Sequence, residues 1–282
     1  MHQVILFYKY TDIADPVALS YSQRELCESL NLKGRIIIAK EGINGTLEGS
    51  AENVEAYVAK LLELPGFSDI DVKRSEGTGN AFPKLKINVR DEIVSSKLHE
   101  SVNPAVDTGN HLDVDLLHKW YEEGEDFVIV DMRNDYEYVS GHFEKSINPQ
   151  FRDFRDLAEK VDSLEIPKDK KVVTVCTGGV RCEKASAFLK QKGYKDVYQL
   201  KNGMHTYLEK YPKGHFKGSL YVFDGRVTVR FDKDGEVIGR CEFCAAPTEL
   251  YANDDTAGRS RHILCCENCL ALKQEQSLSI RR

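Results

Sequence analysis

The segment that follows one predicted buried strand could form a reactive thiol site. Cys176 comes directly after residues 171–175, and Arg181 lies five positions further on, where a helix is predicted to begin. Gly178 and Gly179 allow the backbone to curl, so that several N–H groups and the helix amino terminus point at one sulfur atom. Such surroundings lower the pKa of a thiol and stabilise a thiolate. An inert buried cysteine is the alternative, but it requires neither the glycines nor the arginine.

The length of this loop indicates its chemistry. Four residues separate Cys176 from Arg181, one fewer than in cysteine phosphatases, so the loop suits a sulfur group better than a phosphate. Arg181 would supply positive charge or bind an anionic substrate. Cys182 is a second thiol, which either resolves an oxidised Cys176 as a disulfide or packs without reacting. The sequence leaves both roles of Cys182 open.

A second group of cysteines has the spacing of a metal site. Five of the eight cysteines lie in the last 42 residues. Two CxxC pairs with 21 residues between them predict a tetrahedral zinc site of the ribbon type, formed by Cys241, Cys244, Cys266 and Cys269. Cys265 competes with Cys266 for the third position, His262 is a weaker candidate ligand, and four free thiols are the alternative. Zinc binding would contribute to the folding of this short segment.

The composition is that of an ordinary globular protein. Of the 282 residues, 41% are hydrophobic and 30% are charged, and this length predicts two domains with room for a small third. The sequence holds no apolar run long enough for a membrane span. The first residues lack the pattern of a secretion signal, and the clustered cysteines are typical of a cytoplasmic protein. The net charge of −6 excludes an overall basic footprint, so RNA binding would depend on local patches.

Hydrophobic periodicity divides the chain into segments. Residues 1–95 have a β-α-β-β-α-β order, with strands at 4–10 and within 35–50 and a first helix at 20–32, which is typical of a ferredoxin-like α+β domain. Residues 96–112 are rich in Ser, Asn, Pro and Asp and are predicted to be a linker.

The second half of the chain has a different pattern. In residues 113–217 near-continuous apolar strands alternate with helices, which indicates an α/β domain with a parallel sheet covered on both faces. Residues 218–282 hold a predicted hairpin with Asp-Gly at its turns and then the cysteine-rich, zinc-ribbon-like tail. We therefore expect an α/β multidomain protein.

The motifs of residues 113–217 resemble those of a rhodanese domain. They comprise the thiol loop, the turn at 200–204, and the shorter motifs Asp131-Met132-Arg133, Glu137-Tyr138 and Gly141-His142-Phe143 with Asn148. The resemblance implies that Cys176 carries a persulfide. We expect the substrate to be contacted by the thiol loop and by the first of the shorter motifs, that is by Thr177, Gly178, Gly179, Val180, Asp131 and Arg133.

The chain as a whole resembles the bacterial tRNA uridine hydroxylases. The segment Lys40-Glu41-Gly42-Ile43-Asn44-Gly45-Thr46, the CTGGVRCEK thiol loop and the cysteine-rich tail occur in one chain, in this order. The resemblance implies an enzyme that makes 5-hydroxyuridine at the wobble position, with molecular oxygen as co-substrate and the anticodon region of tRNA as partner.

Basic residues of the first segment are the candidates for RNA binding. The turn at 42–45 would bring Lys40, Glu41 and Asn44 to a phosphate or a base edge, or would simply close a hairpin. A local basic patch is expected from residues along two predicted strands, namely Lys84, Lys86, Arg90, Lys33, Arg35 and Lys40. Phe82 is expected to stack on an unpaired anticodon base.

Two routes and two other functions remain open. A Cys176 thiolate that adds to C6 of uracil would make C5 nucleophilic, and a Cys176 persulfide is the second working species. The sequence shows no flavin, dinucleotide or haem motif and no two-histidine-one-carboxylate pattern for iron. A thiosulfate-type sulfurtransferase or persulfide carrier is the alternative function, and a non-catalytic binding module is the third.

Overall fold

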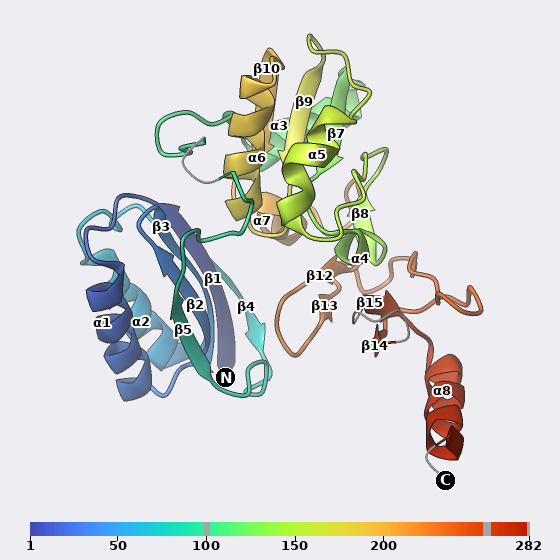
Figure 1. The fold of residues 1–282 in the computed structure, drawn as a ribbon, viewed down its shortest axis with the longest axis horizontal. Coiled ribbons are helices and arrows are strands. Elements are labelled where there is room, and N and C mark those ends of the chain that lie inside the picture. Colours follow the sequence, from blue (N-terminus) through green and yellow to red (C-terminus); the bar gives the residue numbers. More distant parts are fainter. Residues whose placement is uncertain (99–101, 256–260, 281–282) are drawn as a thin grey trace.

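The chain folds into three successive parts. The computed structural model describes residues 1–98, 102–255 and 261–280. Figure 1 shows a sheet with two helices, then an α/β part, then a C-terminal part with short strands and a final helix. No helix in these described ranges is long and apolar enough to span a membrane.

The N-terminal part is a five-stranded sheet with two helices. Its strands are β1 (His2–Tyr10), β2 (Lys33–Ala39), β3 (Gly42–Ser50), β4 (Val72–Gly77) and β5 (Leu85–Val89), in the order β4-β1-β3-β2-β5. Its helices are α1 (Pro16–Ser29) and α2 (Ala51–Leu62). The arrangement confirms the predicted ferredoxin-like plan, with β5 at one edge, parallel to β2.

The first helix begins earlier than predicted. Asp15 caps α1, because its side chain accepts a hydrogen bond from the backbone N–H of Ala18 at 2.9 Å, and Pro16 occupies the first turn. An acidic cap followed by proline is a common helix start. Leu19 in the first turn already packs against the core, so the helix begins one turn before the predicted start at residue 20.

The helices leave one face of this sheet uncovered. Ile5 and Phe7 of β1 are fully buried in the core beneath α1 and α2. Their neighbours Leu6 and Tyr8 point the opposite way, because side chains alternate along a strand. Figure 1 shows both helices on the side of the sheet away from the C-terminal part, so the uncovered face is turned toward the rest of the chain.

The α/β part has the predicted parallel sheet between helices. Its strands lie in the order β6-β10-β9-β7, and they are β6 (Asn110–Leu112), β7 (Phe127–Asp131), β9 (Lys171–Val175) and β10 (Asp196–Leu200). One core lies under α5 (Leu157–Asp162) and α6 (Val180–Gln191), and a second lies under α3 (Val114–Glu123) and α7 (Gly203–Lys210). Shorter elements follow β7, namely α4 (Asp135–Tyr138), β8 (Gly141–Phe143) and the 3₁₀ turn η2 (Phe154–Asp156).

The C-terminal part consists of short ladders and one helix. β11 (Phe216–Gly218) pairs with β8 of the α/β part. The predicted hairpin forms around Asp224-Gly225, but its strands β12 (Leu220–Tyr221) and β13 (Thr228–Val229) are only two residues long. β14 (Tyr251–Asp254) and β15 (Arg261–Leu264) form a second pair, and α8 (Glu267–Ile280) follows.

A buried lysine joins the N-terminal sheet to the α/β part. Lys184 of α6 has no exposed side-chain surface, and its Nζ lies 2.9 Å from an oxygen of Glu41 and 2.7 Å from an oxygen of Glu92. Glu41 also accepts from the backbone N–H of Ile93 at 2.7 Å, and the Asn44 amide donates to the Ile93 carbonyl at 3.0 Å. The segment from Lys40 to Thr46 therefore fixes the chain that leads into the α/β part.

Two tyrosines of β1 complete this joint. The Tyr8 hydroxyl donates to a carboxylate oxygen of Glu183 at 3.1 Å. The Tyr10 hydroxyl donates to the backbone carbonyl of Val180 at 3.2 Å. Both contacts reach the first turn of α6, so the uncovered sheet face is held over the amino terminus of that helix.

Replacing Lys184 by methionine tests the energy of the joint. Lys184→Met leaves Glu41 and Glu92 without their shared cation, so we expect the free energy of unfolding, measured in urea, to fall by about 3–5 kcal/mol. The matched control is Lys192→Met at the end of α6, because Lys192 pairs with Asp162 where both side chains are partly exposed and contributes less than about 1 kcal/mol. Equal losses of unfolding free energy in the two variants would contradict a stabilising role of Lys184 between the two parts.

Candidate active site

Cys176 lies at the junction of a strand, a loop and a helix. It follows β9 directly and is fully buried, and the backbone N–H of Gly179 donates to its Sγ at 3.2 Å. Gly179 has a φ of +104° and precedes the first residue of α6. A Cβ on Gly179 would lie 2.7 Å from the Tyr8 hydroxyl oxygen, so glycine is required both by the backbone turn and by the close approach of β1.

The surroundings of Cys176 favour its thiolate. Burial alone would raise the pKa of the Cys176 thiol, but the Cys182 thiol, the Arg181 charge and the backbone N–H groups of Cys182 and Arg181 lower it to about 6. Burial and the hydrogen bond to Cys176 raise the pKa of Cys182 well above its ordinary value. Cys182 therefore stays protonated and donates to a charged Cys176, which fits the predicted reactive thiol.

Arg181 is held in place by a carboxylate rather than left free. Its guanidinium donates to both oxygens of Glu137, at 2.6 and 2.8 Å, and Glu137 is fully buried. One nitrogen also lies 3.5 Å from Thr177 Oγ1. The bidentate pair fixes the guanidinium plane, so Arg181 supplies positive charge to the Cys176 loop from a fixed position.

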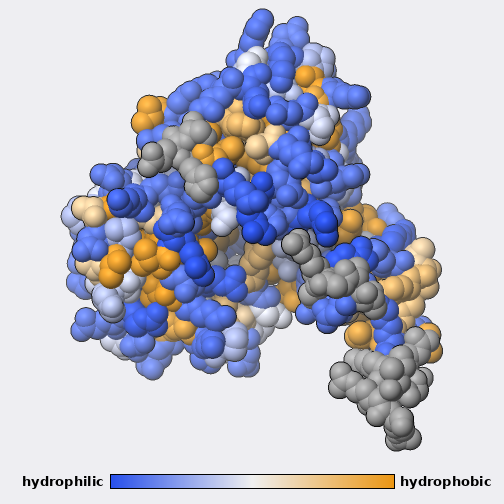
Figure 2. All heavy atoms as spheres, in the orientation of Figure 1, coloured by the Kyte–Doolittle hydropathy of each residue, from blue (hydrophilic) through white to orange (hydrophobic). Residues whose placement is uncertain are grey.

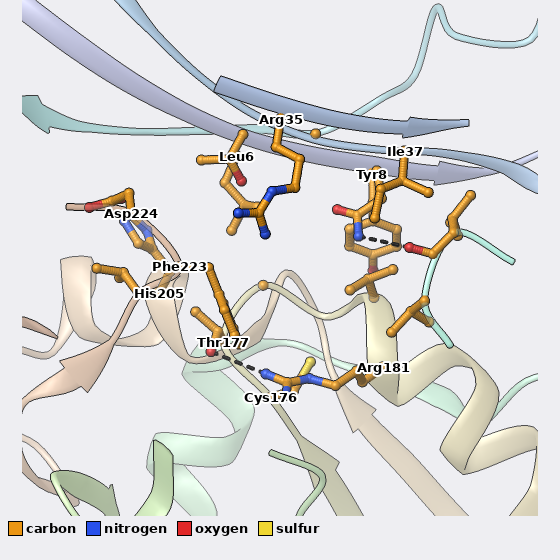
Figure 3. Close-up of a pocket in the computed structure, with 18 of the residues that line it drawn as sticks. Leu6, Tyr8, Arg35, Ile37, Cys176, Thr177, Arg181, His205, Phe223 and Asp224 are labelled. Carbon is orange, nitrogen blue, oxygen red and sulfur yellow. Dashed lines mark hydrogen bonds between the residues drawn. The ribbon is translucent and has the colours of Figure 1, made fainter. Parts of the chain in front are cut away.

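A cavity of about 480 Å³ lies over this loop, between the three parts of the chain. Figure 3 shows Leu6, Tyr8, Arg35 and Ile37 of the N-terminal sheet opposite Cys176, Thr177 and Arg181. The space-filling view shows a recess between the N-terminal sheet and the α/β part on an otherwise mostly hydrophilic face (Figure 2). The uncovered sheet face thus forms the roof of the site.

Most basic side chains of the cavity wall have carboxylate partners. Besides Arg181 with Glu137, the pairs are Lys73 with Asp71, Arg155 with Asp153 and Arg226 with Asp224. Arg35 has no such partner among the described residues, and Figure 3 shows its guanidinium pointing into the cavity. It is the lining cation best placed to meet an anionic or carbonyl oxygen of a ligand.

The structure brings only part of the expected site together. The predicted thiol-loop and turn residues that line the cavity are Cys176, Thr177, Gly178, Val180, Arg181 and Asn44, and Gly179 contacts the sulfur through its N–H. Arg35 of the predicted basic patch and Phe82 also line it. Lys40, Glu41 and Arg90 are not among the described lining residues; Glu41 instead binds Lys184.

Asp131 and Arg133 also lie behind the site rather than in it. Both are fully buried, and the Arg133 guanidinium donates to Asp131 at 2.7 Å and to the Gly141 carbonyl at 2.6 Å. This pair ties the end of β7 to β8, and neither residue is among the described lining residues.

His205 and Phe223 are among the lining residues that sequence reasoning missed. His205 of α7 and Phe223 reach the cavity from the other side of the thiol loop. The His205 backbone N–H donates to the Thr177 carbonyl at 3.1 Å, which connects the turn before α7 to the loop. Both lie outside any recognisable motif, so only the docking of the parts reveals them.

The paired cysteines converge on a group that suits a metal ion. The sulfur atoms of Cys241, Cys244, Cys266 and Cys269 all lie within 4.8 Å of one another. Backbone N–H groups, led by that of Cys266, outweigh burial and lower the pKa of Cys241 to about 6, as a thiolate ligand requires. Cys265 does not belong to the group; its thiol faces the Cys266 carbonyl oxygen at 3.7 Å.

Family comparisons divide the chain along the same lines. Residues 2–93 match the UPF0176 acylphosphatase like domain, residues 113–210 match the Rhodanese-like domain, and residues 217–279 match the Rhodanase C-terminal family. Fold and site thus define a rhodanese-type protein in which Cys176 faces a second, acylphosphatase-like domain.

Relatives that match nearly the whole chain identify its family. A protein of Corynebacterium urealyticum named tRNA uridine(34) hydroxylase is 40% identical over 277 residues, which cover 95% of this chain and 93% of that protein. A protein of the same name from Onion yellows phytoplasma is 42% identical over 269 residues, which cover 94% of this chain and 87% of that protein. The chain belongs to the tRNA uridine(34) hydroxylase family.

The thiolate of Cys176 can be titrated directly. The difference in ultraviolet absorbance between wild type and Cys176→Ala reports the Cys176 thiolate. This difference should rise with pH with a midpoint near pH 6, because the charged form is present above this pH and lost below it. Adding Cys182→Ala to both proteins should raise the midpoint, since the thiolate loses a donor. Cys27→Ala is the control, because burial raises the pKa of Cys27 to about 12. A midpoint at the ordinary pKa of a free thiol would contradict a stabilised thiolate at Cys176.

Proposed function

We propose that this protein hydroxylates uridine 34 of tRNA to 5-hydroxyuridine, with Cys176 as the reacting residue. The observation that carries the proposal is a buried, charged sulfur at the floor of a cavity of about 480 Å³, a volume typical of small-ligand sites. A single base turned out of its stack is the part of a tRNA that suits such a cavity. The names of the relatives support the same reaction.

The Cys176 thiolate explains how an unreactive ring carbon is activated. Its addition to C6 of uracil moves an electron pair toward C5 and O4, so that C5 becomes the nucleophile that takes up oxygen. A pKa of about 6 keeps the sulfur charged at neutral pH, as addition to the ring requires. Elimination of the sulfur with loss of the C5 proton restores the ring.

The oxygen balance gives Cys182 a role. Molecular oxygen places one atom on C5, and the other leaves as water, which consumes two electrons and two protons. The Cys182 thiol reduces the hydroperoxide formed at C5 by taking its outer oxygen as a sulfenic acid. After elimination frees Cys176, its thiolate displaces this oxygen as water and forms the Cys176–Cys182 disulfide, which an external thiol reduces before the next turnover. Cys182 donates a hydrogen bond to Cys176, so this pair is a source of electrons within the site, and Cys182 is the resolving thiol.

Phe223 is the stacking surface for the base. It lines the cavity, its ring is 44% exposed, and its centroid lies 5.6 Å from the Arg181 guanidinium carbon. Phe82, the aromatic residue expected from sequence, is only 6% exposed and forms part of the wall. An exposed ring next to Cys176 meets the need of single-stranded RNA recognition, which relies on stacking of unpaired bases.

The β2–β5 edge of the sheet is the proposed phosphate-binding surface. Arg35 lies beside Lys86 in the parallel register, and the further exposed basic residues of these two strands and their ends are Lys33, Lys84, Lys40 and Arg90. Because Arg35 also lines the cavity, the surface leads from the open edge to Cys176. Phosphate contacts of this kind position an RNA without reading its sequence.

Zinc is the ion proposed for the four cysteines. Thiolate ligands at tetrahedral distances favour zinc over the harder divalent ions. Its role is structural, because all four positions are taken by protein ligands. We place the enzyme in the cytoplasm with its tRNA substrate.

A complementation experiment tests the proposed function. Cells that lack this protein are supplied with wild type, Cys176→Ala or Phe223→Ala, and wobble nucleosides are measured by mass spectrometry. We expect 5-hydroxyuridine-derived nucleosides to return with wild type, to stay absent with Cys176→Ala because the nucleophile is lost, and to return only in part with Phe223→Ala. Loss of a thiolated nucleoside with no change in the hydroxylated ones would instead identify a sulfur donor.

The basic edge has its own test in the salt dependence of tRNA binding. Lys84, Lys86 and Arg90 are replaced together by alanine, and we expect weaker binding and a slope against salt that falls by about one unit for each lost phosphate contact. The control removes three exposed lysines of other surfaces, Lys119, Lys145 and Lys213, which changes the net charge equally. Equal affinities of the two variants would show that only overall charge matters.

A further inference from the structure

Two histidines and a glutamate meet on the α3–α7 side of the α/β part. His118 and Glu122 lie four residues apart on α3, and His215 precedes β11. One ligand atom of each lies within 4.8 Å of the others, and His215 Nε2 is 2.8 Å from Glu122 Oε1. None of the three is among the described residues that line the active-site cavity, so the cluster is separate from the proposed reaction.

The His118 ring is fixed in orientation. Its Nδ1 lies 3.0 Å from the Tyr207 hydroxyl oxygen. The ring also stacks on Tyr211, with centroids 3.9 Å apart and planes 6° from parallel. With Nδ1 held by an oxygen, Nε2 is the nitrogen that remains for a ligand.

The His215 ring is fixed in the same way. Its Nδ1 lies 3.1 Å from a carboxylate oxygen of Glu144, and the ring stacks on Tyr121 with centroids 4.2 Å apart. The second Glu144 oxygen is 3.2 Å from Lys217 Nζ, which holds this carboxylate in place. A histidine that donates Nδ1–H to a carboxylate and presents Nε2 is the usual form of a metal ligand.

We propose that His118, Glu122 and His215 bind a divalent transition-metal ion of the zinc type. The ligands are the two Nε2 atoms and the Glu122 carboxylate, with solvent completing a tetrahedral shell. Ligand atoms around such an ion lie roughly 3.4 Å apart, so the cluster needs only a small adjustment. The Glu122 side chain is 61% exposed, which gives the ion a path from solvent.

The site ties two distant parts of the chain together. His215 is 93 residues from Glu122, so a bound ion would fix the segment that leads into β11, and with it the C-terminal part, to α3. The same separation explains why no two-histidine-one-carboxylate pattern is visible in the sequence. Folding assembles one, with imidazole and carboxylate ligands that suit zinc, copper or nickel.

Cobalt(II) titration of the full-length protein tests the site. The four cysteines are first loaded with zinc, and cobalt(II) is then added as the spectroscopic probe. We expect one further equivalent, with ligand-field absorption of a nitrogen and oxygen site and no thiolate-to-cobalt charge-transfer band. Glu122→Gln removes an exposed ligand without disturbing the core, and we expect it and His118→Gln to weaken cobalt binding at least tenfold.

A matched histidine separates this site from nonspecific binding. His142 also stacks on a tyrosine, Tyr138, at 3.9 Å, and its Nδ1 contacts the Tyr138 backbone carbonyl oxygen, but it has no carboxylate partner among the described residues. His142→Gln should bind cobalt like wild type. The proposal is overturned if no further equivalent binds, if its spectrum shows thiolate ligands, or if Glu122→Gln binds as well as His142→Gln.

Discussion

Lys184 is buried only while the N-terminal sheet is docked on α6. Removing an ammonium ion from water costs several kcal/mol unless carboxylates neutralise it, and both of its partners, Glu41 and Glu92, come from the chain before the α/β part. The same docking brings the uncovered sheet face over the loop of Cys176 and closes the cavity. The reactive sulfur is therefore enclosed by residues that belong to another part of the protein.

Enclosure strengthens the interactions that stabilise the Cys176 thiolate. Away from bulk water, hydrogen bonds and charges act on the sulfur through a low dielectric and are stronger than in solution. The Cys182 thiol, the Gly179 N–H and the fixed Arg181 charge offset the cost of burial. A rhodanese loop that faced water would serve equally well for exchange with small sulfur compounds. Under the roof of the N-terminal sheet, the reaction we propose for the same loop is addition to a single base.

The sequence predicted what is local and missed what depends on docking. The geometry of the loop from Cys176 to Arg181 follows from a strand, a turn and a helix within a few residues, and the four cysteines are two CxxC pairs whose spacing is visible in the sequence. Asp131 and Arg133 were expected at the substrate because their motif resembles one of the rhodanese domain, but they pair with each other in the interior.

Residues contributed by other parts of the chain could not be found in this way. His205 and Phe223 reach the cavity only because three parts of the chain meet there, and the same docking brings Arg35 of the predicted basic patch to the cavity. In the Lys40–Thr46 segment, which was expected to touch RNA, Glu41 and Asn44 hold the joint, and Asn44 also lines the cavity. A motif can thus be typical of a family because its residues make the contact that positions a site.

In the proposed reaction, oxygen from O2 reaches a uridine held against Cys176. The most direct measurement incubates the purified protein with an anticodon stem-loop RNA under isotopically labelled O2. We expect one labelled oxygen on uridine 34 with wild type and none with Cys176→Ala. An unlabelled RNA, with sulfur transfer from thiosulfate to cyanide by the same protein, would contradict it.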